Sequence, residues 1–296
     1  MLTLQQCPSC QHKTWQPALT ARDHLVTGEN FAIVKCENCG LLFTNPRPED
    51  DNLPGYYESE EYISHSNQAQ SVTDQLYKVA RYFTLRQKRR IIEKHHHHHD
   101  KTLLDVGCGT GHFLQHCQHK GWQISGMEPH SPAREKAARL TGTNIYANLH
   151  VIKSQQFAVI TLWHVLEHVT DLRATMQRLY ELLREDGLLV VAVPNHQAYE
   201  ASKFGPFWAA WDVPRHLYHF DRHSIGRLFA AYKLELIATL PMWLDSYYIS
   251  LLSNQYTTGD KKLLNSFITG SLSNIYAIKT GNFSSLIYLF RKAAAS

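Results

Sequence analysis

Short apolar runs alternate with amphipathic stretches through most of the chain after residue 100. Apolar runs of about four to eight residues are typical of buried strands, whereas apolar residues three or four positions apart are typical of helices that cover a sheet. The runs predict strands at residues 102–105, 123–128, 143–146, 157–162, 188–193, 234–240 and 284–290. Because helical patterns stand between most of these runs, the sequence predicts a doubly wound α/β domain.

Helical spacing fills most of the gaps between the predicted strands. It predicts helices at residues 131–140, 172–183 and 222–231, and a helix or helix pair at 73–94. Asp186-Gly187 is predicted to be a turn before the fifth strand. Residues 245–281 are also helical in pattern, so we expect one large domain at 67–296 with 245–281 as an insert before the last strand. That insert is the predicted place for a substrate cover or a dimer contact.

Three glycines follow the first strand at alternate positions. Asp105 ends the apolar run, and Gly107, Gly109 and Gly111 let the backbone turn sharply and approach a ligand before a helix begins. The free N–H groups at such a helix start favour an anion. The dinucleotide fingerprint G-x-G-x-x-G would need a glycine at His112, so this motif disfavours nicotinamide cofactors.

The next strand ends in a second acidic residue. Glu128 lies 23 positions after Asp105, where a carboxylate at a strand end can accept both hydroxyls of a ribose. With Glu128 in register, the glycine loop resembles the first motif of class I S-adenosylmethionine (SAM)-dependent methyltransferases, and the resemblance covers about residues 101–238. It implies a Rossmann-like seven-stranded sheet whose last strand is antiparallel. It also implies a SAM site made by Asp105, Gly107, Cys108, Gly109, Gly111, Glu128, Asn148 and Trp163.

Four of the six cysteines form two C-x-x-C pairs near the N-terminus: Cys7 with Cys10, and Cys36 with Cys39. Each pair turns tightly enough to place two thiolates on one tetrahedral ion, and a disulfide reading would need an oxidising compartment. A signal peptide would be apolar where Cys7 and Cys10 stand. We therefore predict a small zinc ribbon with a structural Zn²⁺ at residues 1–45 and a cytoplasmic protein.

Residues 46–66 are predicted to be a linker, because their prolines and acids oppose regular structure. The segment also carries several aromatic and polar side chains that suit either a lid over bound molecules or a contact that docks the ribbon on the large domain. These residues are Tyr56, Tyr57, Tyr62 and His65.

The fourth strand is followed by His164-Val165-Leu166-Glu167-His168. This segment resembles one shared by many small-molecule methyltransferases, including ubiquinone-biosynthesis O-methyltransferases, in which a Glu precedes Val-Leu-Glu-His and helps to hold a metal. Here His164 stands in place of that Glu. One interpretation is a metal on His164, Glu167 and His168, but capping and packing at a strand-to-helix junction is the commoner role, and methyl transfer requires no catalytic metal.

Aromatic residues, an arginine and two histidines crowd residues 204–220, after the fifth strand. The segment resembles a Trp-x-x-Pro-Arg-His-Leu stretch of bacterial methyltransferases that also carry an N-terminal Cys₄ ribbon. It is interpreted as a substrate wall or as an aromatic plug over the sheet edge. His216 is the candidate general base, because an imidazole titrates near neutral pH. Its competitors are His219, His164, His65 and Tyr62.

Composition adds few constraints. Of 296 residues, 44% are apolar and 19% are charged, and the formal net charge is +4, which describes an ordinary globular protein. No apolar run approaches the roughly 18–20 residues of a membrane span. The dense basic cluster at 86–90 fits a solvated helix face, and the tract His95–His99 is interpreted as an inserted loop or a cloning artefact. Membrane-spanning and nucleic-acid-binding roles are therefore not expected.

These observations favour a SAM-dependent methyltransferase that modifies a small-molecule or carrier-linked substrate, with oxygen as the preferred acceptor atom. One alternative is a ribosomal-RNA methyltransferase whose zinc ribbon binds RNA, although the Gly-His pair of that group is missing after Cys39 and no basic stripe is present. Another alternative is a SAM-binding protein without catalytic activity. The sequence does not set the acceptor or the oligomeric state.

Overall fold

The structure is a computed structural model that describes residues 1–57, 72–153 and 155–293. Its strands are β1 (Trp15–Arg22), β2 (Asn30–Cys36), β3 (Leu42–Thr44), β4 (Thr102–Val106), β5 (Gln123–Met127), β6 (Ile145–Tyr146), β7 (Phe157–Trp163), β8 (Leu183–Pro194), β9 (Tyr218–His219), β10 (Leu234–Pro241) and β11 (Ser285–Lys292). Its α-helices are α2 (Val72–His95), α3 (His112–Gln118), α4 (Ser131–Thr141), α5 (Leu172–Leu182), α6 (Tyr199–Phe204), α7 (Arg222–Ala230), α8 (Asp245–Thr258) and α9 (Leu263–Thr280). Short 3₁₀ helices are η1 (Asp50–Tyr57), η2 (Leu149–Val151), η3 (Leu166–His168), η4 (Gly205–Phe207) and η5 (Ala209–Trp211).

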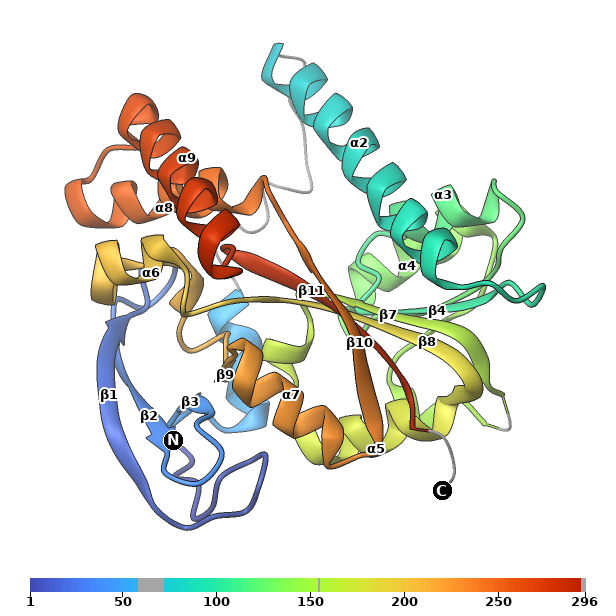
Figure 1. Cartoon of the computed structure of the whole chain (residues 1–296), viewed down its shortest axis with the longest axis horizontal. Helices are drawn as coiled ribbons and strands as arrows, with labels where there is room; N and C mark the ends of the chain where they lie inside the picture. The colour runs from blue at the N-terminus through green and yellow to red at the C-terminus, as the bar shows by residue number, and fades with distance from the viewer. Residues whose placement is uncertain (58–71, 154, 294–296) are drawn as a thin grey trace.

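A seven-stranded sheet forms the centre of the larger part of the molecule, with strand order β10-β11-β8-β7-β4-β5-β6 (Figure 1). Strands β4 to β8 run parallel to one another, and β11 runs antiparallel between β8 and β10. This arrangement confirms the predicted Rossmann-like sheet with an antiparallel last strand.

Helices cover both faces of this sheet. In Figure 1, α2, α3 and α4 lie over one face, and α5 and α7 lie over the other. The central strands are almost wholly apolar because both faces are covered, and every residue of β7 before Trp163 is buried. Apolar side chains fill the two layers between sheet and helices and form two separate clusters.

The predicted turn at Asp186-Gly187 is wrong, because these residues lie within β8. The pairing of β8 with β7 is irregular at this point: Phe157 faces Leu183, whereas Val159 faces Leu188. Leu183 is fully buried, so the chain enters the sheet directly at the end of α5. The additional residues of β8 between Leu183 and Leu188 are accommodated as an irregularity in the strand pairing.

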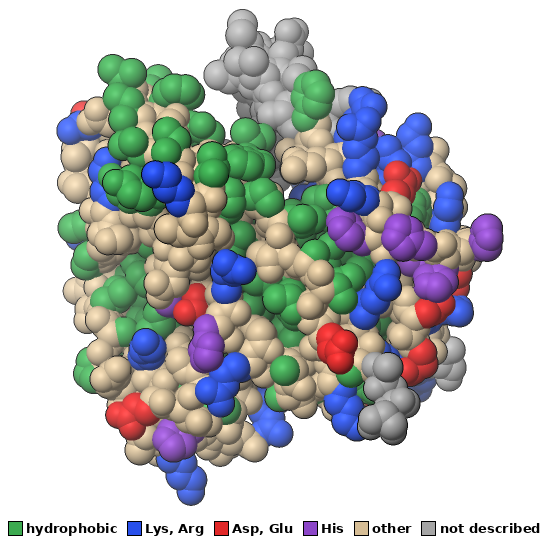
Figure 2. Space-filling view, viewed as in Figure 1, with side chains coloured by type: hydrophobic (Ala, Val, Ile, Leu, Met, Phe, Trp, Pro, Cys, Tyr) green, Lys and Arg blue, Asp and Glu red, His purple; other side chains and the backbone are tan. Residues whose placement is uncertain are grey.

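The insert between β10 and β11 is a helical hairpin of α8 and α9 that packs beside α6. Figure 2 shows apolar side chains gathered over this hairpin, and the most exposed of them belong to α9, where Leu263, Leu264 and Ile278 are 73%, 72% and 67% exposed. Within the described residues, no helix is long and apolar enough to cross a lipid bilayer.

The N-terminal residues form a second, four-stranded antiparallel sheet with the order β1-β2-β3-β9. Its fourth strand comes from the chain after β8, where Leu42 pairs with His219 and Phe43 pairs with Tyr218. The unit predicted at residues 1–45 therefore shares its sheet with the larger part of the chain, as the position of β9 beside β3 in Figure 1 shows.

Candidate active site

The glycine loop after β4 adopts a backbone that other residues rarely adopt. Gly107, Gly109 and Gly111 have φ angles of +68°, +54° and +83°. A Cβ atom at Gly107 would lie 2.5 Å from Val165 Cγ2, and one at Gly111 would lie 2.9 Å from Ala137 Cα. A Cβ atom at Gly109 would meet no atom within 4 Å. The outer two glycines are thus required by packing, whereas the middle one faces open space that a ligand can occupy.

Glu128 follows β5 and lies directly beside this loop. Its Oε2 accepts a hydrogen bond from the Gly109 N–H and its Oε1 accepts one from the His130 N–H, both at 2.9 Å. These two donors hold the carboxylate at the carboxyl edge of the sheet, next to the open face of Gly109. The structure therefore brings together the predicted loop and the predicted acidic residue.

Asp105 lies one strand further toward the centre of the sheet. Its carboxylate is 3% exposed and accepts a 2.6 Å hydrogen bond from the Thr161 hydroxyl. Burial raises the pKa of Asp105 to about 7, although Thr161 and the nearby Lys88 ammonium oppose that shift. Asp105 thus lies next to the glycine loop, where a positively charged ligand would lower the pKa of its carboxylate.

The remaining predicted cofactor residues are Trp163, Asn148 and Cys108. They differ in burial and in their contacts. Trp163, the last residue of β7, packs edge-on against Phe113, and its indole N–H is buried without a hydrogen-bond partner among the described residues. The Lys88 ammonium of α2 lies 4.5 Å from the Trp163 ring centroid. Asn148 is exposed, and its Oδ1 caps η2 by accepting from two backbone N–H groups. The buried Cys108 packs against Gly126.

His164 is held between two carboxylates. Its Nδ1 lies 3.4 Å from Glu167 Oε1, and its Nε2 lies 3.3 Å from Asp245 Oδ2 at the start of α8. Burial alone would lower the pKa of His164, but the two carboxylates outweigh burial and raise it to about 9. At neutral pH this imidazole is therefore a cation, which makes it a poor general base.

His216 lies beside His168, because its loop is fastened to η3 and to β3. The Leu217 N–H donates to the Glu167 carbonyl at 2.8 Å, and the Thr44 hydroxyl donates to the His216 carbonyl at 3.0 Å. The two imidazole rings are 4.6 Å apart in an edge-on arrangement, and His216 is 8% exposed.

His219 is placed differently, although it belongs to the same loop. It lies within β9, is 4% exposed, and its Nε2 is 3.2 Å from the Thr44 hydroxyl. Burial holds the pKa of His219 well below its usual value. It therefore belongs to the interior of the small sheet. The other candidates, Tyr62 and His65, lie outside the described residues.

Residues 77–239, more than half of the chain, match a family model described as a methyltransferase domain. This chain belongs to that family. In fold and motif it is a class I SAM-dependent methyltransferase domain.

Curated relatives and solved structures agree with this assignment. A ubiquinone biosynthesis O-methyltransferase of Rhodopseudomonas palustris (strain TIE-1) is 28% identical over 130 residues, which cover 40% of this chain and 51% of the relative. A second one, of Yersinia enterocolitica, is 31% identical over 106 residues and covers 32% of this chain and 43% of the relative. The chain thus spans about half the length of these relatives.

The magnesium protoporphyrin IX methyltransferase of Synechocystis, solved with bound SAH, has a similar fold at a TM-score of 0.54 and 10% identity, covering 83% of this chain and 100% of that one. A putative sarcosine dimethylglycine methyltransferase of Galdieria sulphuraria gives a TM-score of 0.51 at 13% identity, covering 82% and 99%.

Most aromatic side chains of the segment at residues 204–220 are internal, although Phe207 is 42% exposed. Trp208, Trp211, Tyr218 and Phe220 are each at most 5% exposed. They pack between the small sheet and the larger one, so within the described residues they form a plug rather than an open substrate wall.

Arg215 is the polar centre of this plug and is 1% exposed. It forms ion pairs with Asp23 at 2.9 Å and Asp212 at 2.7 Å, and it donates to the Tyr56 carbonyl at 2.9 Å. Arg215 thereby joins the N-terminal sheet, η1 and the methyltransferase domain in one buried contact.

The four predicted zinc ligands meet at one point of the small sheet. Cys7, Cys10, Cys36 and Cys39 place their sulfur atoms within 4.8 Å of one another, and all four are free thiols. The Cys7–Cys39 and Cys10–Cys36 sulfur atoms are 3.6 Å apart. The hairpin of β1 and β2 fills the long interval between the two pairs.

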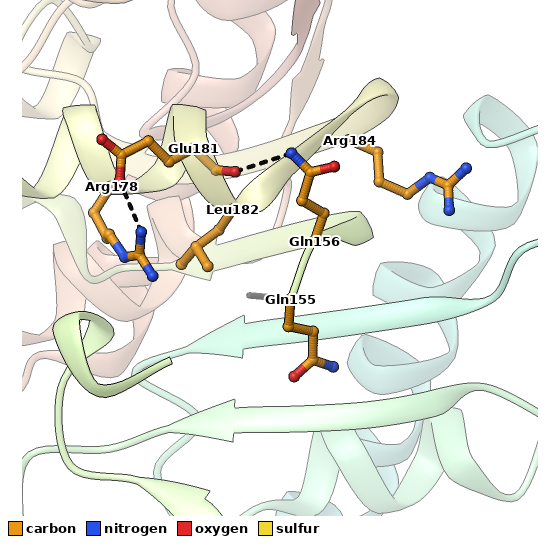
Figure 3. Close-up of a pocket in the computed structure, with 6 residues that line it drawn as sticks. All are labelled: Gln155, Gln156, Arg178, Glu181, Leu182 and Arg184. Carbon is orange, nitrogen blue, oxygen red and sulfur yellow. Dashed lines mark hydrogen bonds and ion pairs between the residues drawn. The ribbon is translucent and has the colours of Figure 1, made fainter. Parts of the chain in front are cut away.

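A surface hollow of about 520 Å³ lies at the opposite edge of the central sheet. It is lined by side chains that come just before β7 and around the start of β8, and Figure 3 shows Glu181 paired with Arg178 there. Since ligands of such sheets bind at the carboxyl ends of the strands, this hollow is not the candidate active site.

Two residues near the site were not predicted from the sequence. Asp245 lies 3.3 Å from His164, and Lys88 contacts the Trp163 ring. Neither belongs to a recognisable motif, and each reaches the site from a helix far away in the chain. The only sequence signals for them are that Asp245 begins the predicted insert and that Lys88 lies in the basic cluster of a predicted helix.

Proposed function

We propose that this protein transfers a methyl group from SAM to a small-molecule or carrier-linked acceptor, at oxygen. The observation that carries the proposal is the open face of Gly109 beside the fixed carboxylate of Glu128, in a chain of the methyltransferase family. The names of the related ubiquinone-pathway O-methyltransferases support oxygen as the acceptor atom.

The residues present suit SAM. Both oxygens of Glu128 are fixed by backbone donors, and a carboxylate so oriented can accept the two hydroxyls of a ribose. Bound SAM supplies an electrophilic methyl group on a sulfonium. The protein then contributes mainly alignment of acceptor and donor, which can lower the barrier by roughly 7–11 kcal/mol.

We propose His216 as the group that accepts the proton of the acceptor hydroxyl. Its Nδ1 donates to the Ala210 carbonyl at 2.8 Å, which leaves Nε2 as the nitrogen with a lone pair. His164 is held as a cation between two carboxylates, and His219 lies inside the small sheet. These contacts support His216 over both competitors.

We further propose that the cysteine cluster binds one structural Zn²⁺. A tetrahedral ion with Zn–S bonds of about 2.3 Å places its sulfur ligands about 3.8 Å apart. The 3.6 Å sulfur separations fit that geometry, and four free thiols in one place fit a reducing compartment, which we take to be the cytoplasm.

The experiment that tests the function combines labelled SAM with a cell extract and follows the label. We expect the label to enter the small-molecule or carrier-bound fraction. Glu128→Ala should weaken SAM binding by roughly 1.5–3 kcal/mol in calorimetry, because a charged acceptor of hydrogen bonds is lost. Glu135→Ala, whose side chain is 63% exposed on α4, is the matched control and should bind SAM as the wild type does.

Three outcomes would contradict the proposal. Label in the nucleic-acid fraction would favour an RNA methyltransferase. SAM binding without any transfer would favour a protein that binds SAM but lacks activity. Equal SAM affinity in Glu128→Ala and the wild type would remove the carboxylate from the binding site.

A further inference from the structure

The helical hairpin of α8 and α9 carries large apolar side chains on its outer side. Six of them belong to α9 and are each between 47% and 73% exposed: Leu263, Leu264, Phe267, Ile268, Ile275 and Ile278. Their spacing is helical, so they share one side of the helix, and together they form the α9 face. Figure 2 shows hydrophobic side chains gathered over this hairpin. Contiguous apolar patches on a protein surface mark sites that bind a partner or a membrane.

The inner side of the hairpin is built from small and polar residues. Those of α9 are Ser266, Thr269, Gly270, Ser273, Asn274 and Ala277, and those of α8 are Ser246, Ser250, Ser253 and Asn254. The Asn254 amide donates to the Ser266 hydroxyl at 2.9 Å and to the Ser250 carbonyl at 3.0 Å. A Cβ atom at Gly270 would lie 2.9 Å from Tyr247 Cα, so the two helix backbones approach closely at this point.

The charged side chains near the ends of α9 are predominantly positive. Lys261 and Lys262 directly precede the helix, Lys279 lies in its last turn, and all three are exposed. α9 has no acidic residue, and the connection from α8 contributes one, Asp260. The carboxylate of α8 itself, Asp245, is paired with an imidazole of the active site. Cations therefore flank the α9 face at both ends, which favours an anionic surface over a neutral one.

The hairpin thus has the opposite arrangement to a helix pair in water, which buries its large apolar side chains. Helices that pack in lipid place small residues and hydrogen bonds of Ser, Thr or Asn between them, and they turn large apolar side chains outward. We propose that the α9 face docks on a membrane surface of anionic phospholipid. The apolar side chains would enter the boundary between headgroups and acyl chains, and the lysines would contact the headgroups.

A second copy of this chain is the rival occupant of the α9 face. Two α9 helices that pack side by side in a symmetric dimer run parallel or antiparallel. A parallel pair brings Lys261 and Lys262 of both copies together, and an antiparallel pair places them beside the partner's Lys279. Because α9 offers no carboxylate to either contact, like charges would face each other. Anionic headgroups would neutralise the same charges, so the observations favour lipid.

The docking surface also narrows the class of acceptor, and this step rests on the proposed function. Asp245 begins the hairpin and lies 3.3 Å from His164, so a hairpin on the membrane holds the active site close to the lipid. An acceptor that is carried on a lipid or dissolved in the bilayer suits this position. We therefore expect the methylated product to be extracted with the lipids.

Vesicle flotation of the full chain, without SAM or acceptor, tests the docking. The vesicles contain phosphatidylcholine alone, or phosphatidylcholine with about a quarter phosphatidylglycerol, and the anionic vesicles should bind at least about ten-fold more tightly. Leu264→Ser combined with Phe267→Ser should weaken binding to the anionic vesicles at least about ten-fold, because two apolar side chains no longer enter the lipid. Lys261→Gln combined with Lys262→Gln should weaken it at least about five-fold and leave binding to neutral vesicles unchanged.

Each pair of changes has a matched control elsewhere on the surface. Leu236→Ser with Ile237→Ser removes two exposed apolar side chains near the start of β10, whereas the hairpin follows the end of that strand. Lys136→Gln with Lys153→Gln removes two exposed lysines, one in α4 and one before β7. Both controls should bind vesicles as the wild type does. All of the substituted side chains are exposed, so each variant should fold.

Three results would overturn the docking surface. They are no binding to either kind of vesicle, equal binding to both kinds by the wild type, and unchanged binding by the variant of Leu264 and Phe267. A dimer that forms without lipid and that this variant dissociates, measured by light scattering, would also overturn it. The α9 face would then belong to a second copy.

The outcome for the proposed function is separate. If vesicles bind but labelled SAM gives no labelled product, the docking surface stands and the proposed function fails. If label is transferred but no vesicle binds, the function stands and the docking surface fails. Label that enters only a water-soluble product, while vesicles still bind, would overturn the lipid-borne acceptor.

Discussion

At the scale of single residues, His164 shows how a distant partner changes the chemistry of a side chain. The sequence places it at the end of a strand, where it qualified as a base. The structure adds Asp245, from the start of the helical insert, and makes the imidazole cationic. No local pattern joins these two residues, so their pairing could not be predicted.

This ion pair predicts a pH-dependent contribution to stability. The pKa of His164 in the folded protein is raised to about 9, above the unfolded value of about 6.5. Its stabilising effect should therefore be complete below about pH 6.5 and should be lost as the pH rises through about 9. His164→Gln should reduce the free energy of unfolding by about 1–2 kcal/mol at pH 6, allowing for screening by solvent, and by much less at pH 10.

Urea unfolding of the wild type and the variant at both pH values measures this difference. A gap between the two proteins that is equal at pH 6 and pH 10 would show that His164 contributes only by packing.

Site residues that belong to a local sequence motif, or to the end of the next strand, are easier to predict. Gly107, Gly109 and Gly111 lie in the order of a known motif, and Glu128 follows at the end of the next strand, so their meeting at one edge follows from parallel pairing of β4 and β5. Trp163 is at this edge as well, but the Lys88 ammonium over its ring is a tertiary contact that no spacing reveals.

At the scale of elements, periodicity located all seven strands of the central sheet, and the family resemblance gave the direction of the last one. The errors have physical causes. Asp186-Gly187 resembles a turn. However, β8 already begins at the buried Leu183, so Asp186 and Gly187 lie within the strand. Strand β9 has only two residues, Tyr218 and His219, and its partner β3 lies far away in the sequence, so no periodic signal exists for it.

The cysteine cluster supplies the prediction at this scale. Cys36→Ser removes one of four proposed thiolate ligands, so elemental analysis should find the zinc lost and the melting temperature reduced. Cys117→Ser is the control: this buried cysteine lies in α3, away from the cluster, and the same chemical change there should leave about one zinc per chain. In both proteins His97, His98 and His99 should be changed to Asn, so that the histidine tract does not bind zinc as well. Zinc retained by Cys36→Ser would remove the residue from the site.

At the scale of the whole molecule, Arg215 links parts of the chain that the sequence presents as separate units. Asp23 directly follows β1 of the N-terminal sheet and lies 192 positions before its partner Arg215, and both side chains are at most 1% exposed. The composition of residues 46–66 predicts a boundary between two units. It does not indicate that the buried ion pair of Asp23 and Arg215 joins the chain on either side of that boundary.

Asp23→Asn should therefore destabilise the entire protein rather than the ribbon alone. Removing one partner of a buried ion pair costs about 3–5 kcal/mol, and we expect the lower end because Asp212 still faces Arg215. The free energy of unfolding at pH 7 measures the effect. Asp50→Asn breaks a pair with Arg47 in which Asp50 is 56% exposed, and it should change stability by less than about 1 kcal/mol. Equal stability of the two variants would mean that the Arg215 contact does not join the units.

The two-residue strand β9 also determines when the N-terminal sheet can be completed during synthesis. A ribosome makes Leu42–Thr44 long before it makes Tyr218–His219, and until then the wholly buried β3 has an unpaired edge. Zinc at the proposed site would hold the cysteine pairs together early, but closure of this sheet must wait for most of the methyltransferase domain to emerge. The N-terminal sheet is thus completed only after most of the chain that follows it has been made, and the nascent protein must keep that edge from pairing with other chains in the meantime.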